Sequence, residues 1–398
     1  MKLIVWTYYF PLLCYRFSRG YSYSGLIKIF HAAMMVDTKL CKVKTIRLLI
    51  TMFLPQMHDV KPTKFKLRCK MITISNEVLT AKFIKRGATL TDVRLKGVEH
   101  GFTLGTNNEA DYDKTLRYFG AIVGPVANRV VNGQIIIDGK VYQIPPNERE
   151  VTSLHGGPNG TAVREWDVVE QTDGAVTFQI ELPDMDCGLP GNRVLTAQFS
   201  VEGSSLKLHL TATTDAPTPM NLANHSYWNM DPQSPHKDST IKTQILEINS
   251  DTYLPVDDMQ IPTGEETLNG HAFDLRNAES KGKVLGDIEH PGIDHNYCLN
   301  NSTVNDPNNI VPIAKLIGKS GNTLTLHSNA AGLQVYTASF MNKVDLLDSS
   351  TRPLTPYAGV ALEPQGWPDA PNQAGFPSIM ISPETPFSQK TVWEFDKA

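Results

Sequence analysis

Cysteine is scarce in this 398-residue sequence, which holds five cysteines with no CxxC spacing among them. Three of them, Cys14, Cys41 and Cys69, lie near the start, which leaves Cys187 and Cys298 for the remaining chain. An odd number without a recognisable spacing argues against a disulfide framework and against a cysteine-based zinc site. We therefore expect a reducing compartment and a cytoplasmic location.

A net basic charge and a long apolar run are also missing. The chain has 37 Lys and Arg against 41 Asp and Glu, so no overall positive field is available to hold nucleic acid. The apolar stretch 3–14 is too short to cross a bilayer comfortably, and Pro11 interrupts it. With 41% hydrophobic and 20% charged residues, the composition is that of an ordinary globular protein. Neither nucleic acid nor a membrane is an expected partner.

Several standard catalytic motifs are absent. A P-loop would need a glycine five residues before Gly318, where the sequence has Ile313. No GxSxG nucleophile elbow, HExxH zinc helix or dinucleotide-binding GxGxxG follows a predicted strand. The sequence therefore indicates no cofactor and no bound metal.

Residues 1–70 differ in composition from the rest, with two apolar patches among scattered lysines and arginines. Three interpretations remain open: a secretory signal or anchor, an accessory segment that packs on the main domain, and an extension without a folded role. The first lacks a small-residue cleavage site after the apolar run. We favour the third, with residues 1–70 outside the catalytic fold and residues 71–398 forming one catalytic domain.

From Met71 onward, short β-prone runs follow one another at period two, between glycines and prolines. Residues 134–138 and 140–144 flank Asp138-Gly139, a strong signal for a β-hairpin. Clear alternation recurs at 175–182, 206–212, 323–327, 333–337 and 360–363. Because no long amphipathic helix interrupts this rhythm, we predict an all-β fold, a large antiparallel β-sandwich with its functional residues on loops and strand ends.

Polar side chains gather at several of the expected strand ends. These clusters are 126–133, 153–157, 220–229, 292–297 and 360–372. Each has an ordinary alternative, because a single histidine in a β-protein is more often a hydrogen-bonded structural residue than a catalyst. Metal binding by His155 and His225 is one further possibility, although no ligand spacing supports it.

Taken together and in this order, the clusters resemble the aldose 1-epimerase family, also called galactose mutarotases. The matching pieces are Asn128-Arg129-Val130, Asn132-Gly133, Ser153-Leu154-His155-Gly156-Gly157, Asn224-His225-Ser226-Tyr227, Gly292-Ile293-Asp294-His295, Glu363 with Gln365 and Pro368-Asp369, and the closing 391–395. The resemblance extends from about Met71 to the C-terminus and includes none of residues 1–70. It implies a mutarotase-like supersandwich and a monosaccharide substrate.

The resemblance also implies roles for particular residues. His225 corresponds to the family's acid and Glu363 to its base. Substrate hydroxyls are expected to be bound by residues that match the same motifs: Asn128, Arg129, His155, Asp294 and Gln365. The segment after the glutamate differs from the family's usual pattern, with Pro364, Gly366 and Trp367 in place of its more common residues. A monomer or a homodimer is expected.

Opening the cyclic hemiacetal of a sugar requires one proton to leave the C1 hydroxyl and another to reach the ring oxygen. A carboxylate and an imidazolium can perform both transfers near neutral pH. We therefore expect Glu363 to start ionised and His225 to start charged, with pKa values on either side of the working pH. Two other classes remain open, a glycoside hydrolase with Asp294 or Asp369 as the second carboxylate, and a carbohydrate-binding module without catalysis.

Overall fold

The structure is a computed structural model that describes residues 71–231, 240–276, 283–288, 291–300, 309–341, 344–347 and 353–398. The predicted extension, residues 1–70, lies outside the described residues. Throughout the described ranges the chain forms β-strands and short 3-10 turns, in agreement with the predicted all-β class. No helix in these ranges is long and apolar enough to cross a membrane.

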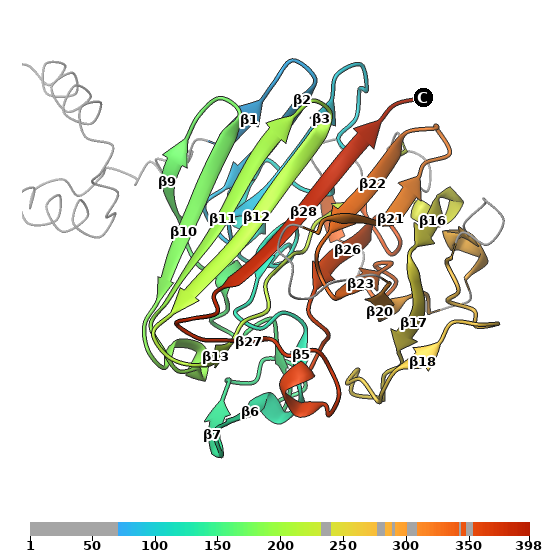
Figure 1. Cartoon of the computed structure of the whole chain (residues 1–398). Coiled ribbons are helices and arrows are strands. Elements are labelled where there is room, and N and C mark those ends of the chain that lie inside the picture. The colour runs from blue at the N-terminus through green and yellow to red at the C-terminus, as the bar shows by residue number, and fades with distance from the viewer. Residues whose placement is uncertain are drawn as a thin grey trace, which may run out of the picture. The chain divides into compact units, whose positions relative to one another are not determined.

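Two antiparallel sheets dominate the fold (Figure 1). The nine-stranded sheet runs in the order β19 (Lys283–Val284), β16 (Ile245–Ile248), β21 (Val311–Ile317), β22 (Thr323–Ser328), β28 (Phe387–Asp396), β12 (Ser205–Thr214), β11 (Arg193–Glu202), β10 (Ala175–Leu182) and β9 (Asp167–Gln171). The six-stranded sheet runs in the order β15 (Tyr227–Trp228), β26 (Val360–Gln365), β23 (Gly332–Tyr336), β20 (Asp294–Leu299), β17 (Ser250–Leu254) and β18 (Glu266–Thr267).

Smaller elements complete the described chain. A three-stranded sheet consists of β1 (Ile72–Ser75), β2 (Leu79–Ile84) and β3 (Thr89–Leu95). The two-stranded pairs are β4 (Ile122–Val123) with β14 (Ala223–Asn224), β5 (Arg129–Val130) with β8 (Ser153–Leu154), β6 (Gln134–Ile137) with β7 (Lys140–Gln143), β13 (Thr218–Pro219) with β27 (Met380–Ile381), and β24 (Val344–Leu347) with β25 (Pro353–Leu354). The 3-10 turns are η1 (Glu109–Asp111), η2 (Val131–Gly133), η3 (Thr161–Val163), η4 (Asp186–Gly188), η5 (Ile241–Thr243), η6 (Leu285–Asp287) and η7 (Ala370–Asn372).

The core lies between the sheets and explains the period-two pattern of the sequence. Along β12 and β28, buried side chains alternate with partly exposed ones, so each strand contributes one face to the core. Trp228 of β15 packs on Trp393 and Phe395 of β28, with ring centroids 5.6 and 5.7 Å apart. Burial of each such ring stabilises the fold by roughly 1.5–3 kcal/mol.

The six-stranded sheet has one apolar face and one polar face. Leu333, Val335 and Leu362 belong to the core, so the residues between them on the strands point to the opposite side. There, Gln334 of β23 pairs in register with Glu363 of β26. The polar face of this sheet forms the floor of the candidate site.

Candidate active site

A cavity of about 470 Å³ lies over the polar face of the six-stranded sheet. A volume of this size is in the range that small-molecule sites occupy. The cavity is lined by Tyr118, Asn128, Arg129, Glu148, Arg149, Leu154, His155, His225, Tyr227, Gln260, Asp294, Gln334, Tyr336, Phe340 and Glu363. Six of the seven predicted site residues are therefore at one cavity, and Gln365 is the exception.

His225 and Glu363 meet because their two segments are neighbours in the sheet. His225 lies between β14 and β15, and β15 pairs with β26, the strand that holds Glu363. The His225 Nε2 is 3.6 Å from the Glu363 Oε1, and both side chains are almost completely buried. The other polar atoms, the His225 Nδ1 and the Glu363 Oε2, have no hydrogen-bond partner among the described residues. Buried polar atoms without a partner are uncommon, and a catalytic role is one explanation for them.

Burial favours the neutral form of both members of this pair. It lowers the pKa of His225 to about 4. Burial also raises the pKa of the Glu363 carboxyl well above its usual value, Asp294 raises it further, and Arg129 opposes the change. This result differs from our expectation of a charged histidine and an ionised glutamate, because desolvation dominates at both groups and outweighs the opposing effect of Arg129 at Glu363. Between the two pKa values the pair holds one proton in total.

His155 presents a donor to the cavity beside this pair. The Asn128 backbone N–H donates a 3.1 Å hydrogen bond to the His155 Nδ1, so that nitrogen is unprotonated. Burial lowers the pKa of His155 well below its usual value, and the nearby His225 lowers it further. A neutral imidazole with an acceptor at Nδ1 carries its proton at Nε2. The rings of His155 and His225 meet edge to face, with centroids 5.3 Å apart.

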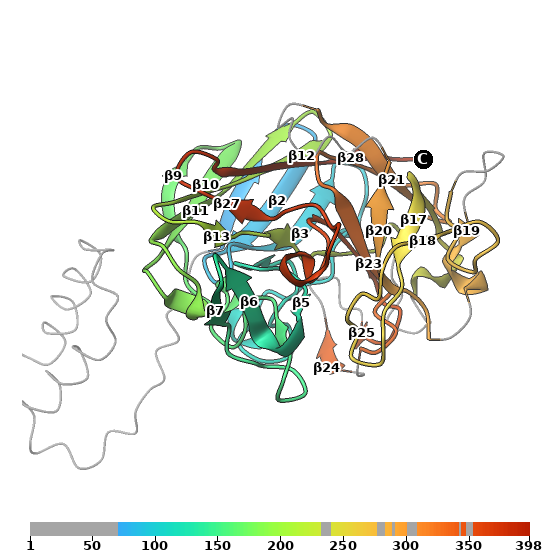
Figure 2. The same cartoon turned by 60° about the horizontal axis from the view of Figure 1, so that its bottom comes forward.

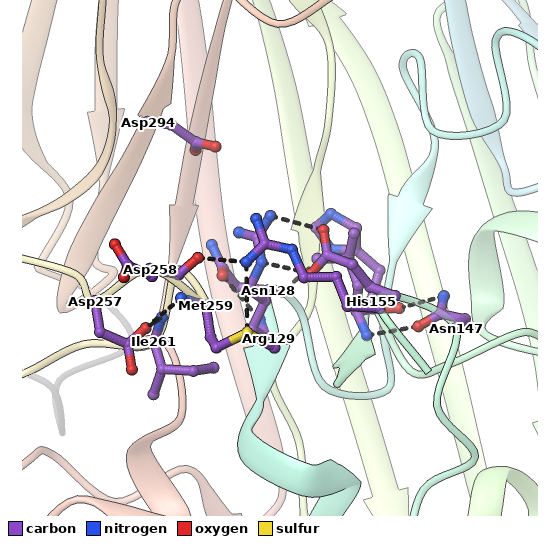
Figure 3. Close-up of polar contacts among 12 residues, drawn as sticks. Asn128, Arg129, Asn147, His155, Asp257, Asp258, Met259, Ile261 and Asp294 are labelled. Atoms are coloured by element: carbon purple, nitrogen blue, oxygen red, sulfur yellow. Dashed lines mark hydrogen bonds and ion pairs between the residues drawn. The ribbon is translucent and has the colours of Figure 1, made fainter. Parts of the chain in front are cut away.

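Arg129 and Asp294 reach the cavity from different elements, Arg129 from β5 and Asp294 from β20. Figure 3 shows Asn128, Arg129 and His155 together on one side, with Asp294 across from them. The Asp294 Oδ1 accepts a 2.7 Å hydrogen bond from the Gln334 side chain. Burial raises the pKa of Asp294, while Arg129 and Gln334 oppose the change.

The loop after β26 fixes the backbone next to Arg129. The Asp369 Oδ1 accepts a 3.0 Å hydrogen bond from the Val131 backbone N–H. In the same region η7 lies beside the hairpin of β6 and β7 (Figure 2), and the Asn372 side-chain amide donates to the Gln134 carbonyl. The Pro368-Asp369 motif therefore connects the strand of Glu363 to the segment of Arg129.

Gln365 is not among the lining residues of the cavity. It lies two residues after Glu363 on the same strand and is completely buried. Its side-chain oxygen and nitrogen have no hydrogen-bond partner in the described part of the chain. Because the alternation of a strand continues past the edge of the cavity, Gln365 shares the face of Glu363 without lining the same space.

Sequence reasoning missed several lining residues, above all Glu148 and Gln334. Glu148 belongs to a charged loop, 147–150, in which no pattern distinguishes one carboxylate from the other. Gln334 is recognisable only through its register with Glu363. Among the described residues, no group of three or more His, Cys, Asp or Glu side chains could hold a metal ion.

Comparison with known proteins places the chain in a family. The family model described as aldose 1-epimerase matches residues 70–394. Human galactose mutarotase is 34% identical over 329 residues, which cover 82% of this chain and 93% of that protein. The aldose 1-epimerase of Escherichia coli K12 is 30% identical over 340 residues, covering 82% of this chain and 95% of that protein.

Solved structures agree with this assignment. A crystal structure of an aldose epimerase homologue from C. elegans has a TM-score of 0.74 at 27% identity, covering 83% of this chain and 99% of that one. The galactose 1-epimerase of Lactobacillus acidophilus has a TM-score of 0.69 at 28% identity, covering 82% and 94%. The family match and the antiparallel fold together make this chain a carbohydrate isomerase. The chain belongs to the aldose 1-epimerase family.

Proposed function

We propose that this cavity interconverts the α and β anomers of aldohexoses such as galactose and glucose, with Glu363 as the base and His225 as the acid. The observation that carries the proposal is the buried pair, whose facing atoms are 3.6 Å apart. The hydroxyl oxygen and the ring oxygen that must exchange protons are bonded to the same carbon of the sugar. Two groups this close can therefore serve both oxygens of one bound ring.

The proton balance of the reaction closes within the pair. Ring opening starts from the distribution in which the single proton of the pair is on His225 and Glu363 is ionised. The C1 hydroxyl proton then moves to Glu363 and the His225 Nε2 proton moves to the ring oxygen, while the C1 bond to the ring oxygen breaks and a C1 carbonyl forms. The pair then holds its proton on Glu363, which is the distribution that burial favours. Rotation about the C1–C2 bond and the reverse transfers produce the other anomer.

The remaining polar side chains bind the hydroxyls away from C1. Arg129 supplies guanidinium donors, His155 supplies its Nε2 proton, and the Asp294 carboxyl accepts. The Asn128 backbone N–H holds His155 in the required tautomer. Because C1 and the ring oxygen must move during the reaction, this set should bind the distal part of the sugar.

Polarimetry of freshly dissolved α-galactose and α-glucose tests the function. The protein should speed the approach to anomeric equilibrium far above the rate in buffer alone. Release of reducing sugar from an oligosaccharide without faster anomer exchange would support the hydrolase alternative. Sugar affinity with no effect on the rate would support a binding module.

The pH dependence of kcat/KM should be bell-shaped, because catalysis needs one proton on the pair. As pH falls, His225 takes up the second proton, and because burial lowers its pKa to about 4 the acidic limb should lie near that pH. As pH rises, the raised pKa of Glu363 places the loss of the last proton well above the ordinary carboxylate range. The measurement is the rate constant from about pH 3.5 to pH 10, with circular dichroism as the control for folding. An acidic limb centred near the usual histidine pKa, about 6.5, would contradict this arrangement.

We also propose that residues 71–398 contain the whole catalytic domain, since the family model matches residues 70–394. A chain that begins at Met71 should have the kcat and KM of the full chain. Equal rates per mole of folded protein are the expected result, and an insoluble or inactive shorter chain would contradict it.

We further propose a monosaccharide substrate. We also propose a cytoplasmic location, since the thiols of Cys187 and Cys298 are both free and buried.

A further inference from the structure

We propose that Glu148 is a positioning residue that holds the Arg129 guanidinium in the orientation needed to bind the sugar. The inference rests on the proposed function, because it concerns how the same cavity recognises its substrate. Glu148 lines that cavity and lies in a turn between β7 and β8.

The contact between the two side chains is a forked ion pair. The Arg129 Nε donates to the Glu148 Oε2 at 2.7 Å, and the Nη2 donates to the Oε1 at 3.0 Å. The Arg129 and Glu148 side chains are only 13% and 24% exposed. A two-point contact of planar groups fixes orientation as well as distance. It also occupies only part of the guanidinium's donor set, so further N–H groups remain for a ligand.

The turn that carries Glu148 is tied to the strand that pairs with Arg129. Leu154 of β8 is the register partner of Arg129 on β5. The Asn147 side chain bonds both backbone groups of Leu154, accepting its N–H at 2.7 Å and donating to its carbonyl at 3.0 Å. The Glu148 carboxylate, one residue after Asn147, accepts a hydrogen bond from the Arg129 side chain. The contacts form a closed ring, in which the backbone and the side chain of Arg129 are held from the same turn.

The turn itself is closed by backbone bonds. Glu148 and Thr152 form an isolated antiparallel bridge, in which the Glu148 N is 3.1 Å from the Thr152 O and the Thr152 N is 3.0 Å from the Glu148 O. A side chain at the base of a closed turn has less freedom to lose than one on an open loop. Glu148 is thus placed to keep Arg129 in position before the sugar arrives, which reduces the ordering cost of binding.

Charge supports the same role. Glu148 raises the pKa of Arg129, as do Asp294 and Glu363, so the guanidinium remains charged although burial opposes it. Without Glu148, Arg129 would be free to turn toward the carboxyls of Asp294 and Glu363 on the cavity floor. The guanidinium N–H groups that should bind sugar hydroxyls would then bond to these carboxyls instead.

The same turn offers a matched control. Glu150 is an exposed carboxylate two residues away, and Arg129 bonds to Glu148 instead. Glu150→Gln therefore makes the same chemical change in the same turn without touching the ion pair. Glu148→Gln keeps the shape of the side chain, but its amide nitrogen cannot accept the second bond of the fork.

The test compares steady-state anomer exchange and galactose affinity in the two variants. Glu148→Gln should raise KM and the dissociation constant about tenfold while changing kcat by less than about threefold, and Glu150→Gln should match wild type. In an Arg129→Ala background, Glu148→Gln should have no further effect on affinity, because the group it positions is gone. Thermal melting of each variant verifies that the fold is intact.

Two results would overturn the inference. One is a Glu148→Gln affinity equal to that of Glu150→Gln. The other is the same loss of affinity from Glu148→Gln in the presence and absence of the Arg129 side chain. Because the galactose titration needs no turnover, it tests Glu148 even if wild type fails to speed anomer exchange, and that failure would count against the proposed function alone.

Discussion

Replacing Glu363 by glutamine should reduce kcat for anomer exchange by about 10²-fold or more, with only a modest change in KM. The amide has nearly the same shape and can still bond a sugar hydroxyl, but it cannot take up the C1 proton. Glu363 is 2% exposed and faces the His225 Nε2, so no solvent-exposed carboxylate can easily replace it. Polarimetric progress curves at saturating galactose measure the loss directly.

A second pair of the same residue types provides the control for this experiment. The His327 Nε2 lies 3.2 Å from the Glu394 Oε2 on the nine-stranded sheet, away from the residues that line the cavity. Glu394→Gln should leave the rate unchanged. If Glu363→Gln kept more than about a tenth of the wild-type kcat, Glu363 could not be the general base, since such a base contributes roughly 10²-fold at least.

His225→Asn should cause a loss of similar size in kcat, because it removes the group that protonates the ring oxygen. Asparagine can donate a hydrogen bond from about the same place, yet it cannot deliver a proton. The double variant with Glu363→Gln should be little slower than either single variant, since the two groups act as one unit. If the fold decrease in kcat of the double variant equalled the product of the two single decreases, the two residues would act independently.

The control for this variant is His327→Asn, which alters the histidine of the surface pair. It should retain full activity. The Tyr118 ring lies nearly parallel to the His225 ring, with centroids 6.2 Å apart, so the pocket wall should remain in place after the substitution. Galactose binding by His225→Asn, measured by titration, should therefore stay close to wild type.

Much of the fold was predictable, because a strand with one buried face has apolar and polar residues in alternation along its sequence. The run 175–182 coincides with β10, and the hairpin at Asp138-Gly139 is confirmed with positive φ at both residues. The way the strands assemble into two sheets was not predictable from periodicity, because partners such as β12 and β28 are far apart in the chain. The rhythm of short strands predicted an antiparallel sandwich, and only the family resemblance implied the mutarotase-like supersandwich.

The candidate site was predictable where chemistry and motif coincide, as at His225 and Glu363, which line one cavity. It was not predictable where position depends on pairing. Gln365 has the same motif support as its neighbours, but the strand carries it past the cavity. Glu148 resembles Glu150 in sequence, and only the closed turn brings one of them to Arg129. Motif and side-chain type thus led to the proposed reacting groups, and three-dimensional contacts led to the residue that we propose holds Arg129.

The bond between the Val131 amide and Asp369 joins residues 238 positions apart, and β28, near the end of the chain, lies between β12 and β22 in the large sheet. During synthesis, the segment that carries Arg129 therefore emerges long before the loop that fixes it. Contacts with such large sequence separation form late, because the loop between them must close first. A nascent chain that lacks its last strand would have neither a complete core nor an assembled cavity. Catalysis should begin only once translation of this domain is essentially finished.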